Sequence, residues 1–235
     1  MRLLVTRPQD DAESFASLLR ERGHIPVVAP LMEVHFFPGQ PLPLDGVQAV
    51  LATSANGVRG IAARTSRRDV TIYAVGPQTA EAARQVGFPI VISAEGDSAA
   101  LVETVARQSD PARGALLHAA GTETAGRVRQ ALQAHGFRVE TEILYEARPA
   151  EVLPSIAADS LRSDALDGVL LFSPRTAKAF AHLVSTADLT AHCARLVAFC
   201  ISAATAEALG ALNFTRVAVA GAPNQDAILE LIPAP

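Results

Sequence analysis

The sequence is poor in cysteine and aromatic residues and has no tryptophan. Its two cysteines, Cys193 and Cys200, are too few for a disulfide framework and lack the spacing of metal ligands, so they predict buried free thiols. Aromatic residues make up 5% of the chain and the net charge is −4, which leaves few base-stacking platforms and no basic surface for nucleic acid. No apolar run approaches the ~20 residues of a membrane span, and no secretory segment precedes the apolar run at Leu3. We therefore expect a cytoplasmic protein that binds neither nucleic acid nor membranes.

Several catalytic motifs are also absent. The chain contains no G-x-G-x-x-G, no Walker A sequence, no H-E-x-x-H and no G-x-S-x-G, which counts against dinucleotide-binding, nucleotide-binding, zinc-protease and hydrolase functions. A response regulator would need an acidic cluster and a lysine at strand ends, and the only lysine is Lys178. His118 follows a predicted strand, but structural packing or surface exposure is its better interpretation.

Short apolar runs alternate with helical patterns along the chain. They occupy residues 3–5, 27–29, 47–51, 72–75, 90–92, 115–117, 139–144, 169–172, 196–200 and 217–219. Because these runs are apolar throughout rather than alternating, they predict strands buried on both faces, as in parallel sheets covered by helices. The predicted fold class is α/β.

An internal repeat is the most informative pattern. Residues 75–82 (VGPQTAEA) return as residues 200–208 (CISAATAEA), and the offset between the copies grows from 113 to 119 at Ser54 and Ser173 and to 126 at Thr79 and Thr205. Two copies of about 110 residues indicate a duplicated domain rather than a solenoid, whose repeats are shorter and more numerous. Duplication alone suggests a cut between tandem domains near Pro111.

The predicted helices begin in a uniform way. Five helix starts have a residue where an N-cap belongs, namely Ser54, Gly76, Asp97, Ser173 and Ser202, and proline follows two of these caps. Helix ends are predicted at residues suited to a positive φ, namely Gly23, Gly87, Gly136 and Asn213. In parallel sheets such strand-to-helix turns meet at the carboxyl edge, where helix N-termini bind anions. We therefore expect a polyanionic ligand.

Two proline-bearing stretches, residues 31–44 and 144–154, interrupt this rhythm. Both resemble linkers that cross between lobes, and they favour domain boundaries near residues 37 and 148. A basic run of Arg64, Arg67 and Arg68 is interpreted as a solvated helix end.

Six short segments together resemble uroporphyrinogen-III synthase. In chain order they are VTRP (5–8), TSANGV (53–58), VGPQTA (75–80), LYE (144–146), FSP (172–174) and ISAATA (201–206). Each motif is short, but their order and spacing extend over nearly the whole chain. The sequence departs from the family at Ser202-Ala203, where the family often has Gly-Pro, as stands here at Gly76-Pro77.

The resemblance implies two flavodoxin-like, parallel-sheet α/β lobes joined by two extended linkers, with the active site in the cleft. Residues 1–36 and 149–235 would form the first lobe, and residues 38–147 the second. The family's enzymes use no cofactor and no metal. They cyclise hydroxymethylbilane, a linear tetrapyrrole rich in carboxylates, to uroporphyrinogen III, invert ring D and release water. Hydroxymethylbilane synthase is the expected transient partner, and a monomer is the expected state.

The resemblance assigns the catalytic role to Tyr145. Its phenol, with an ordinary pKa near 10, is protonated at pH 7 and would assist departure of the substrate hydroxyl, directly or through water. Met32 stands at the equivalent position of the other copy, so Tyr145 breaks the repeat, as a residue acting on one end of a substrate should. The structural alternative is a tyrosine that packs its ring at the hinge.

The resemblance also implies substrate contacts at the helix starts. The residues implied to contact substrate through their hydroxyls are Thr79, Thr205, Ser54 and Ser173. The substrate-binding cap positions beside the two threonines are Gly76, which allows close backbone approach, and Ser202. Arg7 and Arg148 either pair with substrate carboxylates or form salt bridges in the linkers. Asn56 either contributes an amide or only forms the turn before Gly57.

Two other functions stay open from the sequence. One is a non-enzymatic, two-lobed sensor that closes around a small anionic ligand, and the other is an isomerase or lyase for a different polycarboxylate. Tyr145, together with the two threonine-bearing turns, favours the synthase.

Overall fold

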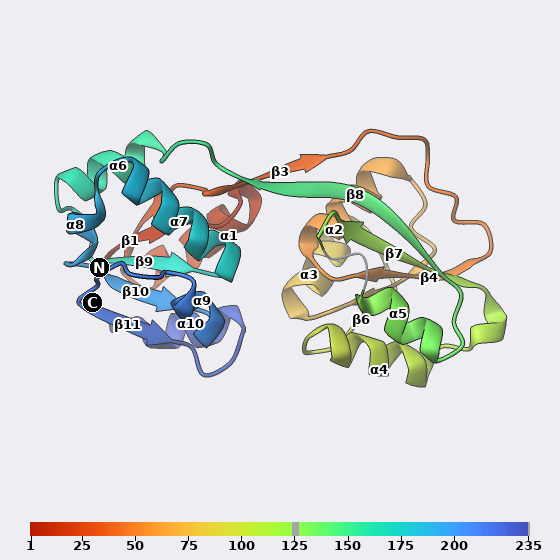
Figure 1. Cartoon of the computed structure of the whole chain (residues 1–235). Helices are drawn as coiled ribbons and strands as arrows, with labels where there is room; N and C mark the ends of the chain where they lie inside the picture. The colour runs from red at the N-terminus through yellow and green to blue at the C-terminus, as the bar shows by residue number, and fades with distance from the viewer. Residues whose placement is uncertain (124–126, 235) are drawn as a thin grey trace. The chain divides into compact units, whose positions relative to one another are not determined.

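The chain folds into two compact units in the computed structural model, which describes residues 1–123 and 127–234. Unit 1 consists of Met1–Glu33 and Arg148–Pro235, and unit 2 of Val34–Ala147 (Figure 1). The predicted lobes place the first crossing between residues 36 and 38 and the second between 147 and 149. No helix in the described part of the chain is long and apolar enough to cross a membrane.

Unit 1 contains a five-stranded sheet in the order β11-β10-β9-β1-β2 (Figure 1). Its parallel strands are β1 (Arg2–Val5), β2 (Ile25–Val28), β9 (Gly168–Leu171), β10 (Val197–Cys200) and β11 (Arg216–Val219). Its helices are α1 (Gln9–Glu21), α6 (Ser155–Arg162), α7 (Pro174–Thr186), α8 (Thr190–Cys193), α9 (Ala203–Glu207) and α10 (Gln225–Leu231). Phe15 and Leu19 of α1 and Ile228 of α10 share one core cluster with the sheet, and α7 and α9 pack against β9 and β10.

Unit 2 contains a six-stranded sheet in the order β3-β8-β7-β4-β5-β6. Its strands are β3 (Met32–Phe36), β4 (Val47–Ala52), β5 (Thr71–Ala74), β6 (Val91–Ser93), β7 (Ala115–Gly121) and β8 (Val139–Pro149). Its helices are α2 (Ala55–Arg64), α3 (Pro77–Gln85), α4 (Ser98–Gln108) and α5 (Arg127–Ala134), with a 3₁₀ turn η1 (Pro111–Arg113). One core cluster joins the sheet to α2 and α3, and a second joins it to α4 and α5.

The two sheets have the same strand order when their strands are matched by the sequence repeat. The matched pairs are β1 with β7, β2 with β8, β9 with β4, β10 with β5, and β11 with β6. Numbered along the repeat, the five matched strands of each sheet read 2-1-3-4-5, which is the flavodoxin-like order, and unit 2 has β3 as an additional edge strand beside β8. Each sheet therefore takes strands from both halves of the chain. Because η1 (Pro111–Arg113) lies inside unit 2, the alternative cut between tandem domains near Pro111 is wrong.

The chain passes from one unit to the other inside two strands. The crossings, at Glu33 and at Arg148, fall within β3 and β8, which are neighbours in the sheet. The Phe37 N–H donates to the Leu144 carbonyl at 2.9 Å in unit 2, and in unit 1 the Ala150 N–H donates to the Leu31 carbonyl at 3.0 Å. Part of each predicted linker is therefore a strand, and β3 is a strand that the sequence did not predict.

The local features of the helices follow the sequence closely. Ser54, Asp97, Ser173 and Ser202 each accept a backbone hydrogen bond as N-caps, and Gly76 is the N-cap of α3. Gly23, Gly87 and Gly136 have φ values of 79°, 94° and 84°, as predicted. The prediction for Asn213 is wrong. The short helix α9 ends at Glu207, and the positive φ, 63°, is found at Gly210 instead.

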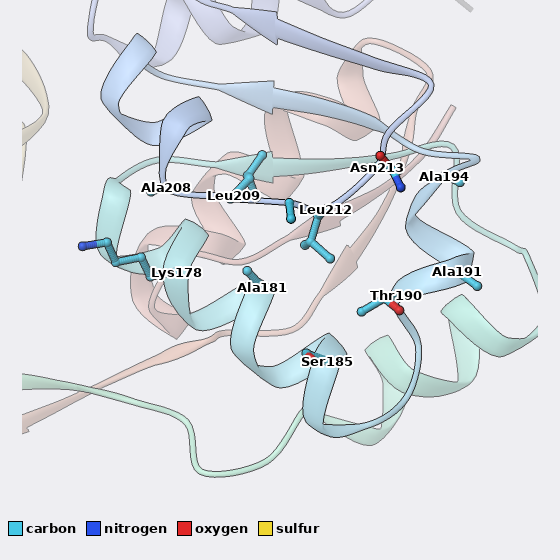
Figure 2. A pocket seen from close by; sticks show the side chains of 12 residues that line it. Lys178, Ala181, Ser185, Thr190, Ala191, Ala194, Ala208, Leu209, Leu212 and Asn213 are labelled. Carbon is cyan, nitrogen blue, oxygen red and sulfur yellow. The ribbon is translucent and has the colours of Figure 1, made fainter.

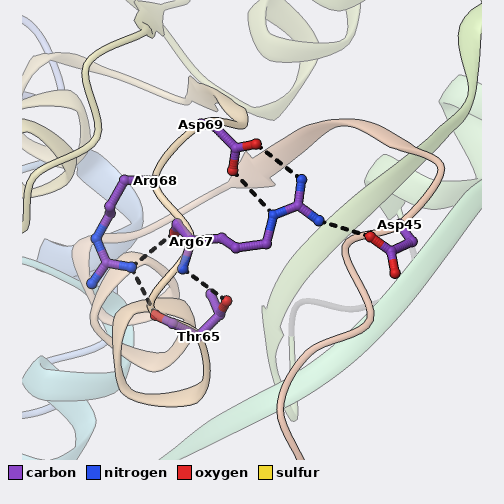
Figure 3. A network of polar contacts seen from close by, with 5 residues as sticks. All are labelled: Asp45, Thr65, Arg67, Arg68 and Asp69. Atoms are coloured by element: carbon purple, nitrogen blue, oxygen red, sulfur yellow. Dashed lines mark hydrogen bonds and ion pairs between the residues drawn. The ribbon is translucent and has the colours of Figure 1, made fainter.

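The basic run after α2 is a structural network rather than a free charged patch (Figure 3). The Arg67 guanidinium pairs with Asp45 at 3.0 Å and with Asp69 at 3.1 Å. The hydrogen bond from Arg67 lowers the pKa of the Asp69 carboxyl. Arg68 donates to the Thr65 carbonyl at 2.7 Å. Arg67 and Arg68 hold the loop after α2 in place. The prediction of a solvated helix end is therefore only partly confirmed.

Candidate active site

Each sheet has one point at which its strand order reverses. This point lies between β1 and β9 in unit 1 and between β7 and β4 in unit 2. Open parallel sheets bind ligands outside the carboxyl ends of the strands at such switch points. Two groups of predicted site residues follow these particular strands, one in each unit.

The switch point of unit 2 brings Ser54 and Tyr145 together. Ser54 follows β4 and caps α2, and its Oγ accepts a hydrogen bond from the Gly57 N–H at 3.1 Å. The same oxygen lies 2.8 Å from the Tyr145 hydroxyl. The Tyr145 side chain is 7% exposed. The structure thus joins the predicted catalytic residue to a predicted substrate contact through a direct hydrogen bond.

A bulge in β8 directs Tyr145 toward Ser54. Ala120 pairs with Ile143, but the next residue, Gly121, pairs with Tyr145, so β8 contains one extra residue at this point. Leu144 and Tyr145 consequently both join the core cluster on the α2 side of the sheet. Bulges commonly re-aim a side chain next to a functional site.

The start of α3 offers hydrogen-bonding groups that have no partner among the described residues. Gly76 caps the helix without a side chain, and Pro77 occupies the first helical position. A Cβ at Gly76 would have only the Gly96 carbonyl oxygen nearby, at 3.7 Å. Thr79 is 6% exposed, and its hydroxyl has no hydrogen bond to another described residue. The first-turn N–H groups and this hydroxyl are therefore available to a ligand.

In unit 1 the equivalent hydroxyls are used in capping. The Ser173 Oγ lies 2.9 Å from the Thr176 Oγ1 and accepts from the Thr176 N–H at 3.1 Å. Ser202 and Thr205 repeat this arrangement, with their hydroxyls 3.0 Å apart. Thr205 is fully buried, so its hydroxyl serves the cap of α9.

Sequence reasoning missed Thr176. The spacing Ser173-Pro174-Arg175-Thr176 matches Gly76-Pro77-Gln78-Thr79, and this match was the available signal. The comparison also shows what is special about Thr79. The N-cap before Thr79 is Gly76, which has no hydroxyl to hydrogen-bond with the threonine, whereas the N-cap before Thr176 is Ser173.

Arg7 lies at the switch point of unit 1. It follows β1, is 7% exposed, and donates to the Gln225 Oε1 at 2.9 Å. Its guanidinium lies 4.5 Å from the centroid of the Phe172 ring and 3.6 Å from the Asp11 carboxylate. Arg7 therefore ties β1, α1, α10 and the residues after β9 together. The ion pair with Asp11 lies within unit 1, and both predicted roles of Arg7 stay predictions.

The two remaining predicted residues lie in other settings. Asn56 accepts from the Arg59 Nη1 at 2.8 Å, so its amide orients a neighbouring side chain on α2. Arg148 is exposed and lies in the last part of β8. Their proposed contacts with substrate stay predictions.

Buried titratable groups elsewhere are unsuited to acid–base chemistry at neutral pH. His118 is fully buried within β7 rather than at a strand end, and burial lowers its pKa to about 4. Burial raises the pKa of the Cys193 and Cys200 thiols to about 11, and both cysteines are free, as predicted. Within residues 1–123 and 127–234 no group of three or more His, Cys, Asp or Glu side chains is placed to hold a metal ion.

A separate hollow of about 590 Å³ lies in unit 1 (Figure 2). Its lining comes from α7, α8 and the segment after α9, and includes Lys178, Ser185, Thr190, Leu209 and Asn213. None of the predicted site residues lines it. Ser54 and Arg7 lie at the switch points, and the turns that carry Thr79 and Thr205 follow the neighbouring strands β5 and β10.

The fold and these residues define a class of protein. It is an α/β protein with two flavodoxin-order sheets, in which serine caps start α2, α7 and α9 and in which Tyr145 and Arg7 are buried. Such helix starts are suited to carboxylate or phosphate groups. Residues 13–230 match the sequence model of "Uroporphyrinogen-III synthase HemD", and the chain belongs to this family.

Individual relatives agree with this family. A uroporphyrinogen-III synthase from Synechococcus elongatus is 30% identical over 201 residues, which cover 78% of this chain and 75% of that protein. A putative uroporphyrinogen-III synthase from Methanocaldococcus jannaschii is 34% identical over 61 residues, covering 26% and 25% of the two chains.

Solved structures show the same fold. The uroporphyrinogen-III synthetase of Helicobacter pylori has a TM-score of 0.63 at 19% identity, with 98% of each chain covered. A mutant uroporphyrinogen III synthase of Thermus thermophilus has a TM-score of 0.50 at 18% identity, with 98% of this chain and 96% of that chain covered.

Proposed function

We propose that this protein is a uroporphyrinogen-III synthase that cyclises hydroxymethylbilane to uroporphyrinogen III, with inversion of ring D and loss of water. The family match over residues 13–230 supports the activity. The structural observation that carries the proposal is the Tyr145 hydroxyl, held 2.8 Å from Ser54 at the switch point of unit 2. The reaction needs a proton donor beside the leaving hydroxyl, and a phenol supplies one at neutral pH.

The substrate carboxylates are the groups that we expect the helix starts to bind. The first turns of α2, α3 and α7 follow Ser54, Gly76 and Ser173 and offer backbone N–H groups without intrahelical partners. The protein has a net charge of −4, so binding depends on these local donors rather than on overall charge. Arg7 supports the same edge of unit 1 through Gln225 and Phe172.

Tyr145 then acts as an acid and later as a base. As the terminal C–O bond breaks, the phenol proton passes to the departing hydroxyl, which leaves as water, and the chain becomes an azafulvenium cation. The substituted carbon of ring D attacks this cation and forms a spiro intermediate. The bond from this carbon to the bridge that joins it to the preceding ring then breaks, and that bridge bonds to the unsubstituted α-carbon of ring D, which inverts the ring. The proton that ring D loses on closure returns to the phenolate. The net reaction therefore releases one water and consumes no cofactor.

Isomer analysis tests the proposal directly. Purified protein is supplied with hydroxymethylbilane by the enzyme that makes it, and the oxidised products are separated into isomers I and III. We expect isomer III in proportion to the amount of protein. Isomer I alone, which is the spontaneous product, would contradict the proposal.

We also infer that the two halves of the chain arose by duplication. The shared 2-1-3-4-5 strand order and the matching caps at Ser173 and Ser54 support this inference. The cleft, the monomeric state, the cytoplasmic location and the contact with hydroxymethylbilane synthase stay predictions.

A further inference from the structure

Phe36 lies beside Tyr145 and keeps much of its ring exposed. It is the last residue of β3, which neighbours β8, the strand that carries Tyr145 (Figure 1). The centroids of the two rings lie 6.3 Å apart, and the ring planes are tilted by 54°. Phe36 is 40% exposed, whereas Tyr145 is 7% exposed. The Tyr145 ring is therefore packed into unit 2, and its neighbour reaches the surface of that unit.

The exposure of Phe36 is unusual in this chain. Within residues 1–123 and 127–234 it is the only aromatic residue among the large apolar residues that are exposed. Val34, two residues earlier on β3, packs against the core cluster that contains Tyr145. Because alternate residues of a strand share a face, Phe36 lies on this same side of the sheet. An exposed aromatic ring beside the proposed acid is suited to stack on another planar ring.

We propose that Phe36 is a catalytic residue, whose ring contacts the pyrrole that bears the departing hydroxyl and stabilises the azafulvenium cation by a cation–π interaction; this proposal rests on the proposed function. When the C–O bond breaks, its electron pair leaves with the oxygen, which takes the Tyr145 proton and departs as water. The positive charge then spreads over the pyrrole ring. A cation within about 6 Å of an aromatic centroid is attracted to the face of that ring.

This interaction distinguishes the cation from the substrate that precedes it. The hydroxymethyl-bearing pyrrole is uncharged, so Phe36 offers it only stacking and apolar contact. Positive charge develops as the hydroxyl departs, and the Phe36 ring then stabilises the transition state more than the bound substrate. Tyr145 supplies the proton, and Phe36 attracts the charge that develops on the pyrrole.

Fluorination of Phe36 tests the proposal while nearly preserving the shape of the ring. Phenylalanines with one, two and three ring fluorines are incorporated at position 36 alone, because each fluorine withdraws electron density from the ring face. We expect kcat for isomer III to fall stepwise to a loss of about tenfold, with KM changed by less than about twofold. The same series at Phe137, which is buried in the core beside α4 and α5, is the matched control and should leave kcat unchanged. Equal kcat values along the Phe36 series would overturn the proposal.

A second background separates a direct role of Phe36 from packing against Tyr145. In Tyr145→Phe the reaction still passes through the cation, so the fluorinated series at position 36 should lower kcat by factors similar to those in the wild type. If the series has no effect in Tyr145→Phe, Phe36 acts only by packing against the phenol, and the proposal is wrong.

An ordinary substitution gives a further test. Phe36→Leu keeps an apolar side chain but removes the aromatic face, so it should lower kcat by about tenfold and leave the midpoint of denaturant unfolding unchanged. Wild-type kcat in Phe36→Leu contradicts the proposal even if the wild-type protein makes isomer III. If the wild type makes isomer I alone, the proposed function fails first and the role of Phe36 fails with it.

Discussion

The Tyr145 ring occupies the space that a side chain at Gly121 would need. A Cβ at Gly121 would lie 2.8 Å from the Tyr145 Cζ, 2.9 Å from its Cε2 and 3.0 Å from its hydroxyl oxygen. Gly121 is the partner of Tyr145 in the bulged register of β7 and β8. The missing side chain at Gly121 and the bulge together define where the phenol lies.

Gly121→Ala should therefore displace the phenol. Contacts this short force the ring to move, and we expect kcat to fall by about tenfold or more and the free energy of unfolding to fall by about 1–3 kcal/mol. Isomer analysis and denaturant unfolding measure the two effects. Gly221→Ala is the control, because a Cβ there would have no atom within 4 Å. Full activity in Gly121→Ala would show that the phenol tolerates displacement.

Tyr145→Phe should slow ring closure without unfolding the protein. We expect kcat to fall by about 100-fold, as for loss of a general acid, and the free energy of unfolding to change by about 1 kcal/mol or less, because the ring still packs. Tyr73→Phe is a suitable control, since the Tyr73 hydroxyl accepts a hydrogen bond from Ser109 at 3.1 Å and has no other partner among the described residues. Turnover within about twofold of the wild type would remove Tyr145 from the mechanism.

The sequence predicts that Thr79→Ala and Thr205→Ala both weaken substrate handling more than stability, and the structure separates the two. The Thr79 hydroxyl has no partner among the described residues, so Thr79→Ala should raise KM and change the free energy of unfolding by less than about 0.5 kcal/mol. Thr205 lies 3.0 Å from the hydroxyl of Ser202, so its loss should cost about 1 kcal/mol of stability. Thr176→Ala serves as the control for a pure cap. If Thr79→Ala and Thr176→Ala lower the free energy of unfolding equally, Thr79 only caps its helix.

His118 should make stability depend on pH. Burial lowers its pKa in the folded state to about 4, whereas the unfolded chain has the ordinary value of 6.5. The unfolded state therefore binds the proton more readily between these values, and stability falls as the pH falls through this window. From pH 7 to pH 5 we expect a loss of about 2 kcal/mol from this group.

Denaturant unfolding at several pH values tests His118. His118→Leu should remove much of the slope between pH 4 and 6.5, and it should not weaken the protein at pH 7, because neither ring nitrogen has a partner in the described part of the chain. His24, whose pKa burial also lowers, will retain a smaller dependence in the same direction. The exposed His182→Gln is the control and should keep the full slope. A slope unchanged in His118→Leu would assign the effect to other groups.

Local structure was the part most open to sequence reasoning. Uniformly apolar runs gave the strands, and Ser54, Ser173 and Ser202 were recognised as N-caps because capping depends on a side chain and the next three residues. Three features escaped. The strand β3 lies in a proline-bearing stretch that predicts a linker. Thr176 has the spacing of Thr79 but lies outside the repeat that pairs Thr79 with Thr205, and Asn213 lies beyond the end of α9.

The sequence by itself determined which residues start each helix and that Tyr145 breaks the repeat, because both are visible within one segment or between two aligned ones. Only the tertiary structure decided that Ser54 and Tyr145, which are 91 positions apart, share a hydrogen bond. That contact depends on β4 and β8 joining the same sheet, on one extra residue in β8 and on the missing side chain at Gly121. Strand pairing and register between distant segments are set by packing of the whole sheet, and no local pattern encodes them.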